Sequence, residues 1–413
     1  MDLDAATKPL GSAMVATIGS SLSNLQLIEE GSYLGIIGPP FGNSISKRLG
    51  KLSYVVFDEL GAPFKRSFSN RILNNIPNLQ WLSSFQLNPN KRVFQRSMAI
   101  ENGFIKLGIN DNLAYEDNFV SLWANIENKL AYFSFEQNLT QNSKLFFGNG
   151  TSPNTYLSSK KGSNYKGIPF LDFSSDGSFI GLDIDIPSRK SLLFSFFQGS
   201  HQDSKRFINS TGTGKGVLIE VKDENQKSVI SYQLGLTTDN SNLLGISSEG
   251  SFGEADKSTT SFIGLEFLKR MKEYYSKSSF HIGQTSSVFN QMGMIEDIED
   301  TYFSSFDFGI YKENIFTDRD SFGIEVYQPL RSELASMNLN LPVGRTKDKQ
   351  ILFENFSLDL TPSGRQINSQ LVYSTNTRYF SFFGKLGLVS DEFHVKESSV
   401  KPYFQLDIEI NLK

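Results

Sequence analysis

The chain of 413 residues contains no cysteine, only three histidines and no long apolar run. The absence of cysteine excludes disulfides, thiol nucleophiles and cysteine-based metal sites. No apolar stretch reaches the roughly 18 residues that a transmembrane helix requires, so we expect no such helix. Lys and Arg (40) and Asp and Glu (44) are interspersed without a basic block. This mixture argues against a nucleic-acid partner.

The histidines do not indicate a catalytic or metal site. His201, His281 and His394 lie far apart, and none has ligand spacing to another. His281 stands between Phe280 and Ile282 in a strand-like stretch, where a lone histidine is more often a polar-face residue than a catalytic one.

Three other patterns resemble catalytic motifs and fail on their surroundings. The stretch 210–217 (STGTGKGV) lacks the first glycine of a phosphate loop and the Ser or Thr after its lysine. Gly150-Thr151-Ser152 resembles the region of a subtilisin-type serine, but Pro153 follows where a small-residue helix is required. Asp183 and Asp185 stand two residues apart, as acidic residues on the polar face of a strand do. This spacing is expected without any catalytic role. We therefore predict no catalytic, cofactor-binding or metal-binding residue, and we predict that this chain is not an enzyme.

The sequence is rich in aromatic residues and in alternating segments. It has 36 Phe and 15 Tyr, although hydrophobic residues make up only 38%. In 321–344, Phe322 and Ile324 fall on one face of an extended strand, and Gly323 and Glu325 fall on the other. Large rings on one face and polar groups on the other suit a membrane barrel, in which short half-apolar strands replace apolar helices.

Short alternating runs follow one another through the second half of the chain, and we expect a strand in each. They lie at 216–223, 228–236, 243–252, 260–269, 274–284, 301–311, 321–331, 335–343, 351–361, 365–375, 379–389 and 402–412, with two more at 179–185 and 190–199. The fold class is therefore predicted as all-β, an antiparallel up-and-down transmembrane β-barrel of about twelve strands (about 12–14). The longer connections, 286–300 and 391–401, are expected on the extracellular side.

The last run has the clearest alternation. Phe404, Leu406, Ile408 and Ile410 share one face and are predicted to face lipid. Asp407 and Glu409 share the other face and, with Glu325, are predicted to face the lumen. A soluble sandwich of two sheets would show the same alternation, with the apolar face against the second sheet.

The first part of the chain differs from the rest. Residues 1–95 are predicted to form an irregular linker with a β-hairpin at 54–68, and residues 96–413 a β-barrel domain whose core meander is 216–413. A helix is possible at 120–130, and the Ser/Asn/Gly/Lys-rich stretch 148–178 is expected to be a mobile loop. The opening MDLDAATKPLG has none of the features of a signal peptide.

Several blocks resemble the C-terminal region of Gram-negative autotransporter proteases of the subtilisin-like serine type, namely the linker and β-barrel without the peptidase domain. The blocks are 3–11, 54–68, 231–253, 258–268 and 278–285, together with two short motifs. The motifs comprise Gln328, Pro329, Leu330 and Arg331, and Thr361, Pro362, Ser363, Gly364 and Arg365. The family usually ends on an aromatic residue, whereas this chain ends Asn411-Leu412-Lys413.

The resemblance implies an outer-membrane anchor or translocator that tethers or exports an N-terminal passenger at the bacterial cell surface. The catalytic residues and the signal peptide would then precede residue 1. The expected partners are the lipid bilayer, the barrel assembly machinery and the chain's own passenger, with no cofactor and no nucleic acid. The alternatives are a soluble secreted all-β binding module and an outer-membrane channel or pore.

Overall fold

The computed structural model describes residues 9–74, 93–110, 130–150, 154, 157, 167–201 and 212–410, apart from residues 10, 19, 24, 26, 31, 37, 38, 175, 241, 242, 245, 254, 290–292, 378, 379, 397 and 398. Over this part the chain is all-β, with strands that pair antiparallel except for β3 (Tyr33–Ile36) and β6 (Ile72–Asn74), and with one short α-helix, α1 (Ser44–Leu49). No helix within these ranges is long and apolar enough to cross a bilayer. The helix considered at 120–130 lies outside the described residues, except for its last position.

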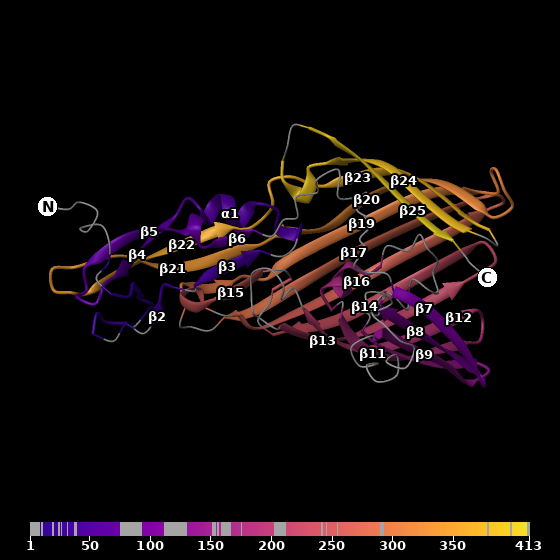
Figure 1. Ribbon diagram of the computed structural model, residues 1–413, viewed down its shortest axis with the longest axis horizontal. Helices are drawn as coiled ribbons and strands as arrows, with labels where there is room; N and C mark the ends of the chain where they lie inside the picture. The colour runs from indigo at the N-terminus through magenta and orange to yellow at the C-terminus, as the bar shows by residue number, and fades with distance from the viewer. Residues whose placement is uncertain are drawn as a thin grey trace, which may run out of the picture.

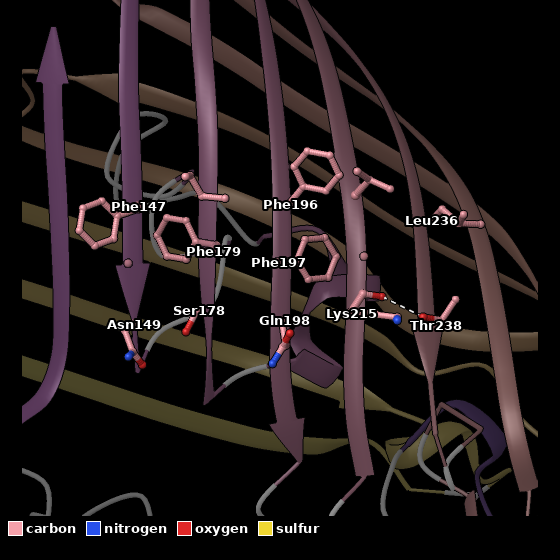
Figure 2. A pocket seen from close by; sticks show the side chains of 14 residues that line it. Phe147, Asn149, Ser178, Phe179, Phe196, Phe197, Gln198, Lys215, Leu236 and Thr238 are labelled. Carbon is pink, nitrogen blue, oxygen red and sulfur yellow. Dashed lines mark hydrogen bonds between the residues drawn. The ribbon is translucent and has the colours of Figure 1, made fainter. Parts of the chain in front are cut away.

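A single large sheet dominates the molecule (Figure 1). In the described part of the chain it has fifteen strands, which are paired in chain order, and every pair is antiparallel. The strands are β7 (Val93–Ile100), β8 (Gly103–Asn110), β9 (Leu130–Thr140), β10 (Ser143–Asn149), β11 (Asp176–Ile186), β12 (Lys190–His201), β13 (Gly212–Glu224), β14 (Ser228–Asp239), β16 (Ala255–Met271), β17 (Tyr274–Phe289), β19 (Thr301–Glu313), β20 (Asp320–Leu334), β23 (Ile367–Asn376), β24 (Phe380–Ser390) and β25 (Lys401–Ile410). Later strands of the sheet, in brown and olive, cross behind β10–β14 in Figure 2, so the sheet curves strongly.

The predicted all-β antiparallel class is confirmed, but the predicted strand count is not. The runs at 243–252, 335–343 and 351–361 do contain strands, yet these strands lie outside the large sheet. The sheet instead includes β7 to β10, which the sequence analysis did not count. Three of them, β7, β8 and β10, are only seven or eight residues long and carry glycine or charged residues within the run, so their alternation is weak in the sequence.

The connections between successive strands of the large sheet alternate strictly in length. At one end they are tight turns: 101–102, 141–142, 187–189, 225–227, 272–273, 314–319 and 377–379. At the other end they are long: 111–129, 150–175, 202–211, 240–254, 290–300, 335–366 and 391–400. The two connections that were expected on the extracellular side, 286–300 and 391–401, both belong to the long-connection end.

Three small sheets and α1 form a second body, here called the composite subdomain, at the long-connection end (Figure 1). Its strands come from the N-terminal segment and from three of the long connections. They are β1 (Met14–Val15), β2 (Leu27–Ile28), β3 (Tyr33–Ile36), β4 (Ser53–Phe57), β5 (Pro63–Ser67), β6 (Ile72–Asn74), β15 (Ile246–Glu249), β18 (Ile295–Ile298), β21 (Ser336–Arg345) and β22 (Ile351–Asp359). The hairpin predicted at 54–68 corresponds to the antiparallel pair β4–β5.

The composite subdomain depends on both parts of the chain. β3 pairs with β15, more than 200 residues further on, and β18, β21 and β22 form one sheet. Buried Val55 and Phe57 of β4 pack with Ile351 and Phe353 of β22. The predicted division at residue 95 stays a prediction, but β3 pairs with a strand beyond it and β4 packs against one.

An aromatic cluster joins the composite subdomain to the inner side of the large sheet. Phe170, from the 3-10 helix Pro169–Ser174, stacks on Phe262 of β16 at a centroid distance of 4.9 Å, and Phe41 meets Phe303 of β19 edge-on at 5.7 Å. Asn154 fixes this connection by hydrogen bonds to both backbone groups of Ile168. The expectation of a mobile loop at 148–178 is therefore wrong for its described residues, because their apolar side chains are buried in the core.

Candidate functional site

The outward face of the large sheet is apolar, and the inward face is polar. On β14, Tyr232 (54% exposed) and Leu234 (55%) point outward, while Ser231 and Gln233, which alternate with them, are buried. Since side chains alternate along a strand, this pattern sorts every second residue to the outside. The same parity holds for the other exposed apolar residues of the sheet: Ile180, Phe196, Val221, Leu236, Ile263, Leu265, Phe280, Ile282, Tyr302, Phe308, Ile310, Ile324, Leu371, Phe380, Leu386, Leu388, Phe404, Leu406 and Ile408.

The apolar part of the outward face has a boundary towards the long-connection end of the sheet. Along β17, outward residues change from Phe280 and Ile282 to Gln284 and Ser286 towards the long-connection end. Gln284 and Ser286 both donate hydrogen bonds to Asp300, at 2.7 and 2.6 Å. On β17 the continuous run of apolar outward residues therefore ends at Ile282, and beyond it only Val288 is again apolar and exposed. The apolar outward residues of the large sheet are here called the belt.

A hydrogen-bonded network of four side chains occupies the inward face. Gln233 of β14 donates through Nε2 to Glu220 of β13 at 3.0 Å and to Glu266 of β16 at 2.9 Å. Its Oε1 lies 3.0 Å from Nε2 of His281 on β17. Because both amide protons of Gln233 go to carboxylates, its oxygen is the acceptor and His281 is the donor.

A glycine makes room for this network. Gly264 of β16 is paired with both Gln233 and His281, so it stands between them. A Cβ at Gly264 would lie 2.5 Å from Gln233 Oε1 and 2.6 Å from His281 Cδ2. The side chains from β14 and β17 meet across β16 because residue 264 has none.

A second inward network lies on the strands near the C-terminal edge. Tyr311 of β19 donates to Glu325 of β20 at 2.6 Å, and Gln370 of β23 donates to the other oxygen of Glu325. Tyr403 of β25 donates to Gln370 across β24, over Gly387, where a Cβ would lie 2.6 Å from the tyrosine ring. Glu325, predicted to face a lumen, is 3% exposed and points inward.

The other residues predicted from the last strand are partly described. Phe404 and Leu406 are each 38% exposed and Ile408 is 58% exposed, on the outward parity. The side chains of Asp407, Glu409 and Ile410 lie outside the described residues. Their backbones pair with Phe383, Ser381 and Phe380.

The two short motifs of the sequence analysis come together at the junction between the large sheet and the composite subdomain. Arg331 donates to the carbonyl oxygens of Gly364 at 3.0 Å and Pro362 at 3.2 Å. Arg365 donates to Gln328 and, through two nitrogens, to Glu333 at 2.9 and 2.7 Å. The motifs are 33 residues apart in sequence, and this junction gives them a structural role.

His394 completes the junction and is held neutral. Its Nδ1 accepts the backbone N–H of Gln366 at 3.0 Å, so its Nε2, 3.0 Å from the carbonyl oxygen of Leu330, carries the proton and donates. Burial, together with the positive charges of Arg331 and Arg365, lowers the pKa of His394 to about 4. Protonation of Nδ1 would break the hydrogen bond that this atom accepts from the N–H of Gln366, which disfavours the charged form of the ring.

Sequence reasoning did not find the inward networks, because each needs the strand register. His281 was interpreted as a lone polar-face histidine, and nothing in the spacing of Glu220, Gln233 and Glu266 links them to it. The rejected phosphate-loop stretch lies in β13 from residue 212 onward, and the side chain of His201 lies outside the described residues. Within the described ranges, no group of three or more His, Asp and Glu is arranged to hold a metal ion.

No family model and no curated protein matches this chain. Among solved structures it is similar to the outer-membrane expressed OmpT of Vibrio cholerae, with a TM-score of 0.41 and 9% identity, over 75% of this chain and 85% of that chain. A likeness this distant assigns no function.

The prediction that this chain is not an enzyme is corrected. The prediction rested on the lack of a serine triad, which excludes one class of catalysis only. The inward face also brings a histidine, an amide and two carboxylates within hydrogen-bonding distance, a set that the linear sequence did not reveal.

Proposed function

We propose that the chain is an outer-membrane β-barrel protein that anchors the composite subdomain at the bacterial cell surface. The observation that carries the proposal is the sorting of side chains on the large sheet, with an apolar belt outside and hydrogen-bonded polar groups inside. Membrane barrels need this sorting, because lipid surrounds the wall and polar groups must be satisfied within it. A soluble binding module would not expose an apolar surface across so many strands.

The alternating connections support an orientation. Outer-membrane barrels have short turns on the periplasmic side and longer loops outside. β7 leads into the short turn 101–102, so it enters from the long-connection end, whereas β25 finishes at the short-turn end. The N-terminal segment would therefore lie outside the cell and the end of β25 in the periplasm.

We further propose that the sheet closes into a barrel. Within the described ranges, β7 and β25 each pair on one edge only. They are the first and fifteenth strands of an antiparallel series, so they run in the same direction and a direct closing pair would be parallel. A parallel closing pair is compatible with a membrane barrel, because mitochondrial barrels with 19 strands exist.

The finer proposal is the role of an autotransporter-type anchor, with the lipid bilayer, the barrel assembly machinery and an N-terminal passenger as partners. It is supported by the place of the N-terminal segment at the long-connection end, which the proposed orientation puts outside the cell. It is also supported by the meeting of the two short motifs at the junction between the large sheet and the composite subdomain. A pore is not proposed, because the aromatic cluster of Phe41, Phe170, Phe262 and Phe303 places two of the connecting segments against the inner side of β16 and β19 at that end.

Single cysteines test the anchor and its orientation, since the natural chain has none. Lys347→Cys places a thiol in the exposed β21–β22 turn of the composite subdomain, and Gln226→Cys places one in the exposed β13–β14 turn at the short-turn end. A membrane-impermeant maleimide should label residue 347 on intact cells and residue 226 only after the outer membrane is opened.

Each outcome has a separate meaning. Recovery of the chain in the soluble fraction would refute the membrane anchor, and labelling of residue 226 alone on intact cells would refute the orientation. An epitope placed before residue 1 should react with antibody on intact cells. Surface labelling at residue 347 with a hidden epitope would refute the display of an N-terminal passenger while leaving the anchor in place.

A further inference from the structure

A hollow of about 660 Å³ lies on the outward face of the large sheet, across β10–β14 (Figure 2). It lies near the long-connection end of these strands, at the edge of the apolar belt. Its two walls are rows of outward side chains, two residues apart along each strand. The hollow is of the size that binds small molecules or one chain of a lipid.

One wall is apolar and the other is polar. The register aligns Phe147, Ile180, Phe196, Val217 and Leu236 in the first row, and Asn149, Ser178, Gln198, Lys215 and Thr238 in the second. Figure 2 shows the labelled members of the two rows at different heights. Across five neighbouring strands, at about 4.8 Å per strand, the hollow is roughly 19 Å long.

The floor of the hollow is the row between the two walls. It consists of Gly148, Phe179, Phe197 and Gly216, which pair in this order. The rings of Phe179 and Phe197 turn inward over the two glycines, where a Cβ would lie 2.6 Å from either ring. The outward side of the floor is therefore backbone alone, and nothing from the sheet fills the space between the walls.

The polar wall carries a single charge. Among the described residues that line the hollow, Lys215 is the only charged one, and it is exposed. The hydroxyl of Thr238 donates to the backbone carbonyl oxygen of Lys215 at 3.5 Å, and this bond does not involve the lysine ammonium. An apolar wall that faces a polar wall carrying one cation suits a molecule with a long apolar part and an anionic head.

We propose that this hollow binds one anionic membrane lipid, with an acyl chain along the apolar wall and the headgroup phosphate beside Lys215. The inference rests on the proposed membrane function, because it takes the outward face to be in contact with lipid. It goes further because it names one site that selects a lipid, whereas the rest of the belt would contact lipid of any kind. Asn149, Ser178 and Gln198 provide hydrogen-bonding groups along the headgroup side.

Lipid retention tests the proposal. The full chain is reconstituted into vesicles of phosphatidylcholine with phosphatidylglycerol as the anionic probe, extracted in detergent, and analysed for bound lipid by native mass spectrometry. The wild-type protein should retain one phosphatidylglycerol in preference to phosphatidylcholine. Lys215→Gln should lower this preference roughly fivefold, which is the effect expected for one basic group near a membrane surface.

Two matched controls separate the site from the general surface. Lys269→Gln removes an exposed lysine of β16 at the other end of the same outward face, and should leave the preference unchanged. Ser178→Phe fills the hollow, whereas Ser261→Phe adds the same ring at an outward serine beyond it. Only Ser178→Phe should abolish retention of both lipids.

The outcomes distinguish the site from the membrane account. If all variants float with the vesicles but the wild type retains no lipid, or if Lys215→Gln behaves like Lys269→Gln, the lipid site is refuted and the barrel remains. If no form of the chain floats with vesicles, the membrane account fails and the lipid site fails with it.

Discussion

Placing a methyl group at Gly264 should uncouple the inward network and weaken the sheet. The new Cβ would lie 2.5 Å from Gln233 Oε1 and 2.6 Å from His281 Cδ2. Both side chains are almost fully buried, so neither has open space into which it can turn. We expect Gly264→Ala to break the bond between His281 and Gln233 and to pull the amide away from at least one carboxylate.

The loss follows from the bonds involved. A hydrogen bond between neutral groups contributes about 1 kcal/mol and one to a charged group about 1.5–3 kcal/mol. If one of the two bonds to Glu220 and Glu266 survives, the free energy of unfolding should fall by about 3 kcal/mol. Gly344→Ala is the matched control, since no atom lies within 4 Å of an added Cβ at that strand position.

Urea unfolding of the protein refolded into lipid vesicles measures the difference between the two variants. A double-mutant cycle sharpens the result, because in a Gln233→Ala background the Gly264→Ala substitution should cost much less. The reasoning is refuted if Gly264→Ala and Gly344→Ala agree to within about 0.5 kcal/mol, or if the cost of Gly264→Ala is the same in both backgrounds.

Two further predictions concern the composite subdomain and its junction. The pKa of His394 is lowered to about 4 in the folded state, against 6.5 for an unperturbed histidine. The unfolded state therefore binds the proton more readily. The free energy of unfolding should be highest above pH 6.5 and should decline as the pH falls towards 4, by up to about 3 kcal/mol. Thermal unfolding of the wild type and of His394→Gln across this range checks it, and an equally steep decline in the variant would contradict the assignment to His394. Residues 1–95 expressed alone should remain largely unfolded, because β3 lacks β15 and β4 lacks the packing of β22. A cooperative β-rich transition in circular dichroism would show instead that the segment is an independent domain.

The sequence predicted the features that depend on alternation within one strand. Phe322 and Ile324 point away from Glu325 as expected, and Phe404, Leu406 and Ile408 share the exposed side. Such sorting is local, since adjacent residues of a strand must face opposite ways. The antiparallel class could be predicted for the same reason, from strands joined by short turns.

Features that depend on register or on distant pairing could not be predicted. Gly264 has a role only because β14 and β17 flank β16, and Arg331 meets Gly364 only because the β21–β22 excursion returns the chain to β20. The alternating strands β21 and β22 looked like barrel wall, since a half-buried strand of a small extramembrane sheet has the same pattern. The outward hollow likewise appears only when five strands are aligned.

The central claim is that the outward face of the large sheet is in contact with lipid. Ile324 of β20 is 56% exposed within the belt, and Leu352 of β22 is 46% exposed on the composite subdomain. Replacing each by arginine puts the same charge on two exposed apolar positions, one in the belt and one outside it. In lipid vesicles, Ile324→Arg should lower the free energy of unfolding by about 2–4 kcal/mol if residue 324 lies near the bilayer midplane. Leu352→Arg should stay within about 0.5 kcal/mol of the wild type, as surface substitutions do in water. Equal and small effects at both positions would contradict the account.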